Sequence, residues 1–143
     1  MRLRYKKNLD ERMFACKDYF LDRTCDGNAL IAMKNPKFVD FRHLFGNDNP
    51  VCLEIGCGKG KFAIEYALSH PEQNILAVER LSNVIVSGAE RAKELNLSNV
   101  RFLVQNAEFL PHFLPDSSVS KVFLNFSCPF PKKTYRNRRL THV

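Results

Sequence analysis

Residues 51–60, Val-Cys-Leu-Glu-Ile-Gly-Cys-Gly-Lys-Gly, join an apolar segment directly to a loop with a glycine at every second position. The apolar run Val51–Ile55 predicts a buried strand. Gly56, Gly58 and Gly60 lack a Cβ atom, so the loop backbone can turn tightly and approach a ligand closely. Glu54 stands two residues before the first glycine. The stretch therefore predicts an α/β protein in which a buried strand carries an acid to a ligand-binding loop.

The residues that follow complete a strand–helix–strand unit. The amphipathic segment Lys61–Ser69 is long enough to be the crossover helix, and Ile75–Glu79 is a second apolar strand that closes with an acid. Glu79 lies at about the distance along the chain at which Rossmann folds carry a carboxylate for ribose hydroxyls. The pattern predicts a Rossmann-type nucleoside site.

The loop differs from the two common phosphate-binding fingerprints. It lacks the Gly-Lys-Ser/Thr ending of nucleoside triphosphate sites, and its glycine spacing is not that of the dinucleotide motif. An acid just before the loop favours a ligand with a positive end over a pyrophosphate. S-adenosylmethionine, which carries an ammonium, a sulfonium and a ribose diol, fits these requirements.

The remaining chain continues to alternate helices and strands. We expect a helix from Pro36 to Leu44 that ends at Gly46, a helix over Ser82–Leu95, a strand over Val100–Val104, a short helix over Ala107–Phe113 and a strand over Lys121–Phe126. On the 82–95 helix we expect a buried face of Ile85, Ala89, Ala92 and Leu95 and an outer face of Glu90, Arg91 and Glu94.

The strands are apolar on successive residues, which is typical of a parallel sheet covered by helices on both faces. Ligands of such sheets bind at the carboxyl ends of the strands. The polar or reactive residues at or just beyond those ends are Glu54, Glu79, Asn106 and Cys128.

Composition places the chain among ordinary globular proteins. Its 143 residues are 45% hydrophobic and 26% charged, no run reaches membrane-spanning length, and the charged start contains no apolar signal core. Five cysteines without a Cys-x-x-Cys pair favour reduced thiols over a disulfide framework or a metal site. We expect a cytoplasmic protein that holds no metal and contacts no membrane.

The net charge of +7 is concentrated at the two ends of the chain. Residues 128–143 hold five basic and no acidic residues, with Phe130 and Tyr135 interleaved. Basic side chains suit phosphates and aromatic rings suit base stacking, so this segment predicts nucleic-acid binding. The basic residues are Lys132, Lys133, Arg136, Arg138 and Arg139.

Several blocks of the sequence resemble bacterial tRNA (guanine-N7-)-methyltransferases. They are Met-Arg-Leu-Arg at 1–4, Phe-Gly-Asn-Asp-Asn-Pro at 45–50, Leu-Glu-Ile-Gly-Cys-Gly-Lys-Gly at 53–60 and the segment 124–141, with Leu-Asn-Phe-Ser, Pro-x-Pro-Lys-Lys and Arg-Arg-Leu-Thr. The resemblance implies a Rossmann-like class I methyltransferase fold with a basic lead-in at 1–50 and a partial catalytic domain at 51–143. It also implies methyl transfer from S-adenosylmethionine to guanosine N7 in the tRNA variable loop.

The resemblance further implies roles for individual residues. Glu54, Gly56 and Gly58 would bind the methionine end of the cofactor, Glu79 its ribose and Asn106 its adenine. Cys128 occupies the position of an active-site residue that also lies by the cofactor. Lys132, Lys133 and Arg136 would contact tRNA.

Two features depart from the family pattern. Where the family has Asp-Pro-Trp-Pro, this chain has Cys128-Pro-Phe-Pro, so a thiol replaces the carboxylate. Guanine N7 already carries a free lone pair and needs no base, so we predict weakened rather than abolished chemistry. A cysteine can also act as a covalent nucleophile, as in pyrimidine C5 methylation, but those enzymes typically have the cysteine after a proline, whereas Pro129 follows Cys128 here.

The second departure concerns the strands beyond the fourth. Family members continue past the position of Val143 with further strands, which implies that the apolar segment 122–126 forms an exposed edge here. Such an edge favours association between copies of the chain. An alternative to the enzyme is therefore a truncated, weak or inactive remnant that binds only S-adenosylmethionine or tRNA.

Overall fold

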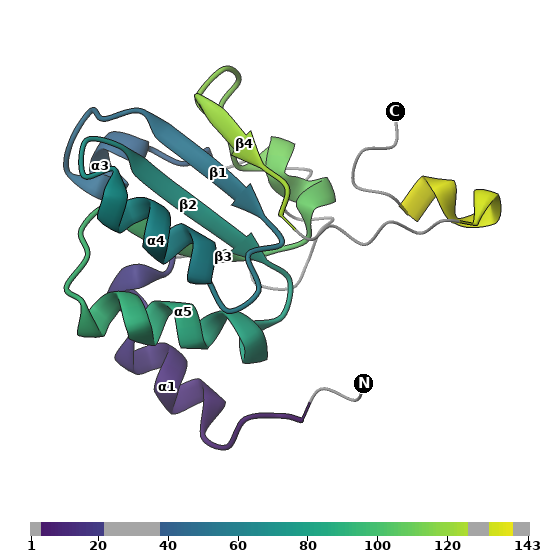
Figure 1. Ribbon diagram of the computed structural model, residues 1–143, viewed down its shortest axis with the longest axis horizontal. Coiled ribbons are helices and arrows are strands. Elements are labelled where there is room, and N and C mark those ends of the chain that lie inside the picture. The colour runs from purple at the N-terminus through teal and green to yellow at the C-terminus, as the bar shows by residue number, and fades with distance from the viewer. Residues whose placement is uncertain (1–3, 22–37, 126–131, 139–143) are drawn as a thin grey trace.

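The computed structural model describes residues 4–21, 38–125 and 132–138 (Figure 1). The elements in chain order are α1 (Leu9–Ala15), η1 (Lys17–Tyr19), α3 (Phe41–Phe45), β1 (Val51–Ile55), α4 (Lys61–Ser69), β2 (Asn74–Glu79), α5 (Ser82–Glu94), β3 (Val100–Val104), η2 (Ala107–His112), β4 (Lys121–Phe123) and η3 (Lys133–Arg138), where η marks a 3₁₀ helix.

The four strands form one parallel sheet in the order β3-β2-β1-β4. β1 is therefore internal, and its residue Glu54 pairs in register with Ala77 of β2 and Phe123 of β4. The chain moves outward from β1 to β3 and then returns to the other side of β1 through η2. This reversal places a topological switch point at the carboxyl end of β1, where ligands of parallel sheets bind.

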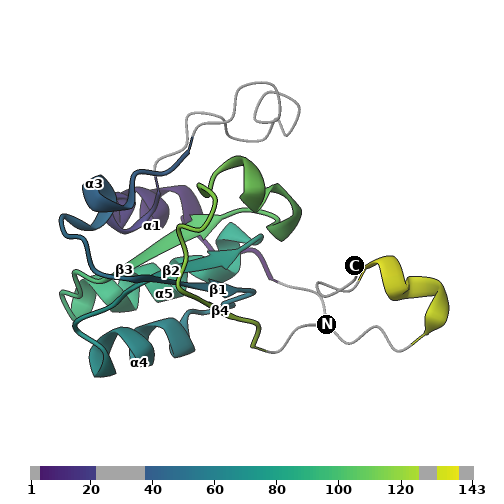
Figure 2. The ribbon, with the colours of Figure 1, turned by 90° about the horizontal axis from the view of Figure 1, so that it is seen from above.

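Helices cover both faces of the sheet, which confirms the predicted architecture. Successive side chains of a strand point to opposite faces, and the two faces have separate cores. On one face, α4 and α5 contribute Ala63, Ile85 and Ala89 to the core. On the other face, Phe45 of α3 and Leu110 of η2 pack on the strands. Figure 2 shows the sheet nearly edge-on, with α3 and α4 on opposite sides.

The N-terminal segment packs on the β3 side of the molecule. α1 contacts α5, and the chain after η1 runs beside β3, where the Leu21 N–H donates to the Phe102 carbonyl at 2.9 Å. Phe20 and Phe102 also form a parallel β-bridge, with ring centroids 6.2 Å apart. The edge of β3 is thus partly paired by residues far away in the sequence.

The opposite edge of the sheet, at β4, exposes apolar side chains. Val122 is 55% exposed and Leu124 is 39% exposed, whereas Phe123 packs edge-on against Phe62 of α4 with ring centroids 4.9 Å apart. The expectation of an exposed apolar edge is confirmed for Val122 and Leu124 but not for Phe123.

Several predicted boundaries were wrong. The helix expected from Pro36 begins only at Phe41, because Asp40 caps it by accepting the His43 N–H at 3.1 Å; Gly46 ends it as expected, with φ 72°. β2 begins one residue early, at Asn74. β4 ends at Phe123 instead of Phe126, and residues 126–131 lie outside the described part of the chain.

The outer face expected for α5 was wrong at one position. Arg91 and Glu94 are exposed, but Glu90 is half-buried against α1, where its two oxygens accept Nε and Nη2 of Arg12 at 2.6 Å. Glu90 was expected to be exposed because the hydrophobic periodicity of α5 does not indicate that α1 packs over this part of the helix.

None of the helices in the described residues is long and apolar enough to cross a membrane.

Candidate functional site: a glycine loop and two acids at the carboxyl edge of the sheet

The glycine loop turns sharply at the end of β1 because three of its residues adopt the left-handed conformation. φ is 77° at Gly56, 57° at Gly58 and 76° at Gly60, values that a side chain disfavours. The N–H groups of Gly56 and Cys57 both donate to the Val78 carbonyl, at 2.8 and 3.0 Å. The loop is therefore fixed to the end of β2 instead of projecting freely.

Gly60 has a second reason to be a glycine. A Cβ atom there would lie 2.9 Å from Cε1 of Phe102 and 3.2 Å from Cα of Gly88. Gly88 is equally crowded, since its Cβ would lie 2.9 Å from the Lys59 carbonyl. The start of α4 and the middle of α5 are thus packed backbone to backbone, which holds the loop in place. At Gly56 and Gly58, by contrast, nothing lies within 4 Å of a Cβ position.

Glu54 is the most unusual residue of the site, because it is 2% exposed in the middle of the sheet. Its Oε1 accepts a hydrogen bond from Asn125 Nδ2 at 3.3 Å. Its Oε2 is buried and has no hydrogen-bond partner in the described residues. The backbone N–H of Ala63 also acts on this carboxyl group and lowers its pKa. Burial raises the pKa of Glu54, and Asn125 and Ala63 only partly offset the rise.

Glu79 lies at the end of β2 and bridges two segments. Its Oε2 accepts the Gly58 N–H at 3.3 Å and its Oε1 accepts the Leu81 N–H at 3.2 Å. The side chain is half-exposed, so both oxygens keep lone pairs that a ligand hydroxyl can use. Glu79 therefore connects the glycine loop to the start of α5 at the rim of the site.

The site is electrostatically negative. Burial, followed by the charges of Glu54 and Glu79, raises the pKa of the Cys57 thiol far above its ordinary value, so that thiol stays neutral. The same two carboxylates would repel a pyrophosphate and attract a cation. This agrees with the interpretation of the loop from its sequence.

The predicted cofactor-binding residues meet at one edge of the sheet, with one exception. Glu54, Gly56, Gly58 and Glu79 lie together at the ends of β1 and β2. Asn106 follows β3 at the same edge, since the preceding Gln105 N–H donates to the Glu79 carbonyl at 3.1 Å; its side chain is exposed. Cys128 lies outside the described residues.

The predicted tRNA-binding residues Lys132, Lys133 and Arg136 are exposed in or beside η3. Figures 1 and 2 show η3 well apart from the sheet, so the structure does not bring these side chains to the glycine loop.

One functional candidate, Asn125, received no role from the sequence. It is the hydrogen-bond donor to Glu54 across the β1–β4 pair, from a position just after β4. The only available signal was a lone amide between two apolar residues at the end of a predicted strand.

Three of the five cysteines, Cys16, Cys52 and Cys57, lie in the described part and are free and buried. Over the same residues no group of three or more His, Cys, Asp or Glu side chains is arranged to hold a metal ion.

Comparison with known proteins agrees with this geometry. Residues 48–143 match the family described as "Putative methyltransferase", so the matched region contains the whole sheet and the glycine loop. The fold also resembles the crystal structure of a "putative s-adenosyl-l-methionine-dependent methyltransferase" from Methanococcus maripaludis. The TM-score is 0.52 and the identity 18%, over 93% of this chain and 57% of that one.

Curated relatives are closer in sequence. The tRNA (guanine-N(7)-)-methyltransferase of Geobacillus thermodenitrificans is 45% identical over 71% of this chain and 47% of its own length. The protein of the same name from Bacillus licheniformis is 36% identical over 99% of this chain and 62% of its own length. The chain thus spans about half to three-fifths of the length of these relatives.

The predicted Rossmann-like class I methyltransferase fold is thereby confirmed for the four-stranded sheet, with its glycine loop at the switch point. Together, the family match over the sheet and the identity to the curated relatives place this chain in the methyltransferase family that contains the bacterial tRNA (guanine-N7-)-methyltransferases.

Proposed function

We propose that this chain uses S-adenosylmethionine to methylate N7 of a guanosine in tRNA, in the variable loop that the family resemblance implies. One observation carries the cofactor assignment: the buried Oε2 of Glu54 has no hydrogen-bond partner within the part of the chain that the structure describes. A buried carboxylate oxygen without a donor costs about 1–3 kcal/mol or more. A ligand ammonium would satisfy it.

The residues present fit the cofactor. Glu54 would bind the ammonium of the methionine end. The space beside the backbone of Gly56 and Gly58 is open, since nothing lies within 4 Å of a Cβ position there. Glu79 would accept hydrogen bonds from the ribose hydroxyls with its remaining lone pairs. Asn106, exposed at the end of β3, would lie by the adenine. The negative potential of the two acids suits a ligand with two positive centres.

The methyl transfer requires no general base, because guanine N7 carries a free lone pair. When bound, S-adenosylmethionine supplies a methyl group activated by its sulfonium. The N7 lone pair forms the new N–C bond as the S–C bond breaks, so the positive charge passes from sulfur to the purine. The chain must hold the donor rigidly and orient the guanine in line, which is worth several powers of ten in rate. A negative environment near the purine would stabilise its new charge.

The names of the curated relatives support tRNA as the substrate. Lys132, Lys133 and Arg136 would contact its phosphates, as expected of exposed basic residues near an aromatic side chain. The cytoplasmic location follows from a tRNA substrate and is part of the same proposal.

Methyl transfer from labelled S-adenosylmethionine to an unmodified tRNA transcript, followed by nucleoside analysis, tests this function. We expect label in N7-methylguanosine, and a transcript with the target guanosine replaced serves as the control. A folded chain that binds the cofactor and leaves the tRNA unlabelled would support the alternative of a binding remnant. Label in another nucleoside would overturn the assignment of the substrate atom.

A further inference from the structure

The chain before α1 is held against α5 beside the glycine loop. The Asn83 side chain makes two backbone bonds to it: Oδ1 accepts the Lys6 N–H at 2.5 Å, and Nδ2 donates to the Arg4 carbonyl at 2.9 Å. The Lys6 ammonium also donates to the hydroxyl of Ser87. These contacts fix residues 4–6 across the first turns of α5, about eighty residues away in sequence.

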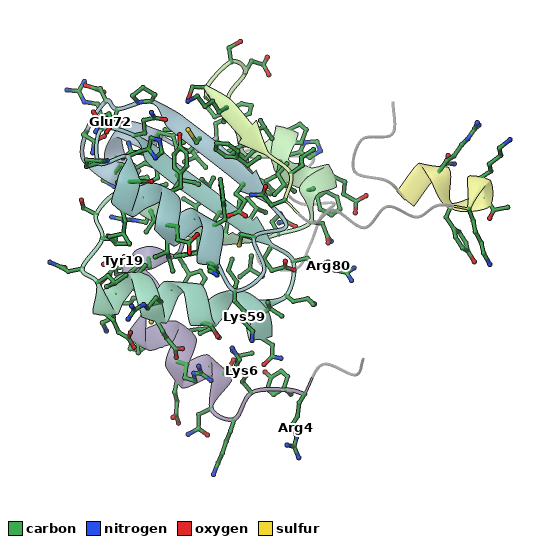
Figure 3. The ribbon with its side chains drawn as sticks, in the orientation of Figure 1. Arg4, Lys6, Tyr19, Lys59, Glu72 and Arg80 are labelled. Atoms are coloured by element: carbon green, nitrogen blue, oxygen red, sulfur yellow. The ribbon has the colours of Figure 1, made fainter. Side chains whose placement is uncertain are left out.

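This placement brings basic side chains from three segments together. The Lys59 carbonyl approaches α5 at Gly88, next to the Ser87 that binds Lys6. Arg80 lies between Glu79 and Leu81, and the Glu79 carboxylate accepts the N–H groups of both Leu81 and Gly58. Figure 3 shows Arg80 beside the carboxyl ends of the strands, Lys59, Lys6 and Arg4 following below it toward the start of α1, and Glu72 at the opposite end of the sheet. We call these four residues the basic rim.

The positive charge of the basic rim is not neutralised within the described residues. None of the four residues forms an ion pair there, and the nearby Glu90 is engaged by Arg12. Arg4, Lys59 and Arg80 are exposed, and only Lys6 is half-buried. Burial, with repulsion from Arg12 and Lys59, lowers the pKa of Lys6, as expected where cations gather.

We propose that the basic rim binds the phosphate backbone of the RNA substrate directly beside the cofactor site. The proposal rests on the proposed function and adds a surface separate from Lys132, Lys133 and Arg136. Long exposed side chains spread over three segments suit an extended polyanion, whereas a single phosphate would be held in a concave pocket. The N-terminal segment thereby acquires a role: it completes an RNA-binding surface next to the glycine loop.

A pair of charge-matched double variants tests the proposal. Arg4→Gln with Lys59→Gln removes two rim charges. Arg42→Gln with Lys121→Gln removes two charges from α3 and from the amino end of β4, where both side chains are exposed. Binding of an unmodified tRNA transcript is measured as a function of salt concentration. We expect the rim variant to bind more weakly and to lose about one to two units of the log–log salt slope.

Two further measurements separate the possible outcomes. S-adenosylmethionine titration of both variants should match the wild type, which shows that the loop is intact. Bound tRNA should also protect Lys59 of the wild-type protein from acylation, as read by mass spectrometry, without any substitution. If the wild type binds tRNA while the two double variants behave alike and Lys59 stays reactive, the basic rim is overturned but the proposed function stands. If the wild type binds no tRNA, both fail.

Discussion

At the residue scale, Glu54 connects the stability of the fold to ligand binding. Leu53 and Val51 of the same strand pack into the core, yet Glu54 buries a carboxyl group between β2 and β4, where Asn125 Nδ2 donates to it at 3.3 Å. An unligated charge at this depth destabilises the fold. A cationic ligand group would offset that cost, so the site is built to be more stable when occupied.

The raised pKa of Glu54 predicts a pH dependence of stability. As pH rises above the ordinary value of 4.5, the unfolded chain loses this proton before the folded chain does, so the free energy of unfolding falls until the folded group also ionises. Glu54→Gln removes this contribution. Urea unfolding from about pH 4 to 7 should show the wild type losing stability relative to Glu54→Gln. A difference that stays constant or reverses would contradict the raised pKa.

The glycine loop predicts unequal costs for two similar substitutions. Gly58→Ala faces only a left-handed φ of 57°, which costs about 1–2 kcal/mol. Gly60→Ala adds a clash at 2.9 Å with Phe102, so its total cost should be roughly 2–4 kcal/mol. Urea denaturation of both variants measures the difference. Equal stabilities would mean that Phe102 moves aside freely.

The resemblance to the family implies an aspartate at the position of Cys128, which predicts a gain of activity when that aspartate is introduced. A neutral thiol stabilises a cationic purine less than a carboxylate does. Cys128→Asp should therefore raise the methyl-transfer rate at saturating donor, and Cys128→Asn is the uncharged control. An unchanged or slower rate for the aspartate variant would count against the prediction.

At this scale the sequence predicted which residues of the candidate site lie together but not all of their contacts. A glycine loop after an apolar strand, with an acid on each strand, is a local pattern, and Glu54, Gly56, Gly58 and Glu79 do lie together. Asn125 and Glu90 were missed because their partners, Glu54 and Arg12, are more than seventy residues away.

At the scale of elements, the two edges of the sheet differ in how well they are covered. The β3 edge is partly paired by Phe20 and Leu21, whereas β4 is short and carries the exposed Val122. An open apolar edge can pair with another strand. Association through β4 was expected from the sequence and stays a prediction.

A lysine in the exposed edge tests that prediction. Val122→Lys should reduce association in sedimentation velocity while changing the free energy of unfolding by no more than about 0.5 kcal/mol, since the side chain faces solvent. Leu68→Lys on α4, where the leucine is equally exposed at 55%, is the matched control and should leave association unchanged. A wild type that remains monomeric at every concentration would refute edge pairing.

The helices and strands themselves were largely predictable, because their apolar periodicity is a property of the local sequence. β1, α4 and β3 have the expected bounds. The errors fall at α3, whose start depends on capping by Asp40, at β2, which begins one residue early, and at β4, whose strand pairing ends at Phe123 opposite Glu54. Capping geometry and the length of a pairing partner are not encoded in hydrophobic periodicity.

At the scale of the whole molecule, acidic and basic side chains occupy different parts of the surface around the glycine loop. The carboxyl edge of the sheet places two acids at the glycine loop, and the cationic side chains of the basic rim lie to one side of it. The positively charged methyl donor would thus bind at the two acids, and the negatively charged nucleic acid would bind at the adjacent basic side chains. This arrangement, together with the family match, underlies the proposed function.

Calorimetric titration of S-adenosylmethionine into the folded chain tests the central claim most directly. We predict one site per chain and an affinity about 10- to 100-fold lower in Glu54→Gln, since a charge-assisted hydrogen bond is worth about 1.5–3 kcal/mol. Glu72→Gln, at the opposite end of the sheet, should bind like the wild type. A folded wild type that takes up no cofactor, or a Glu54→Gln variant that binds it equally well, would contradict the claim.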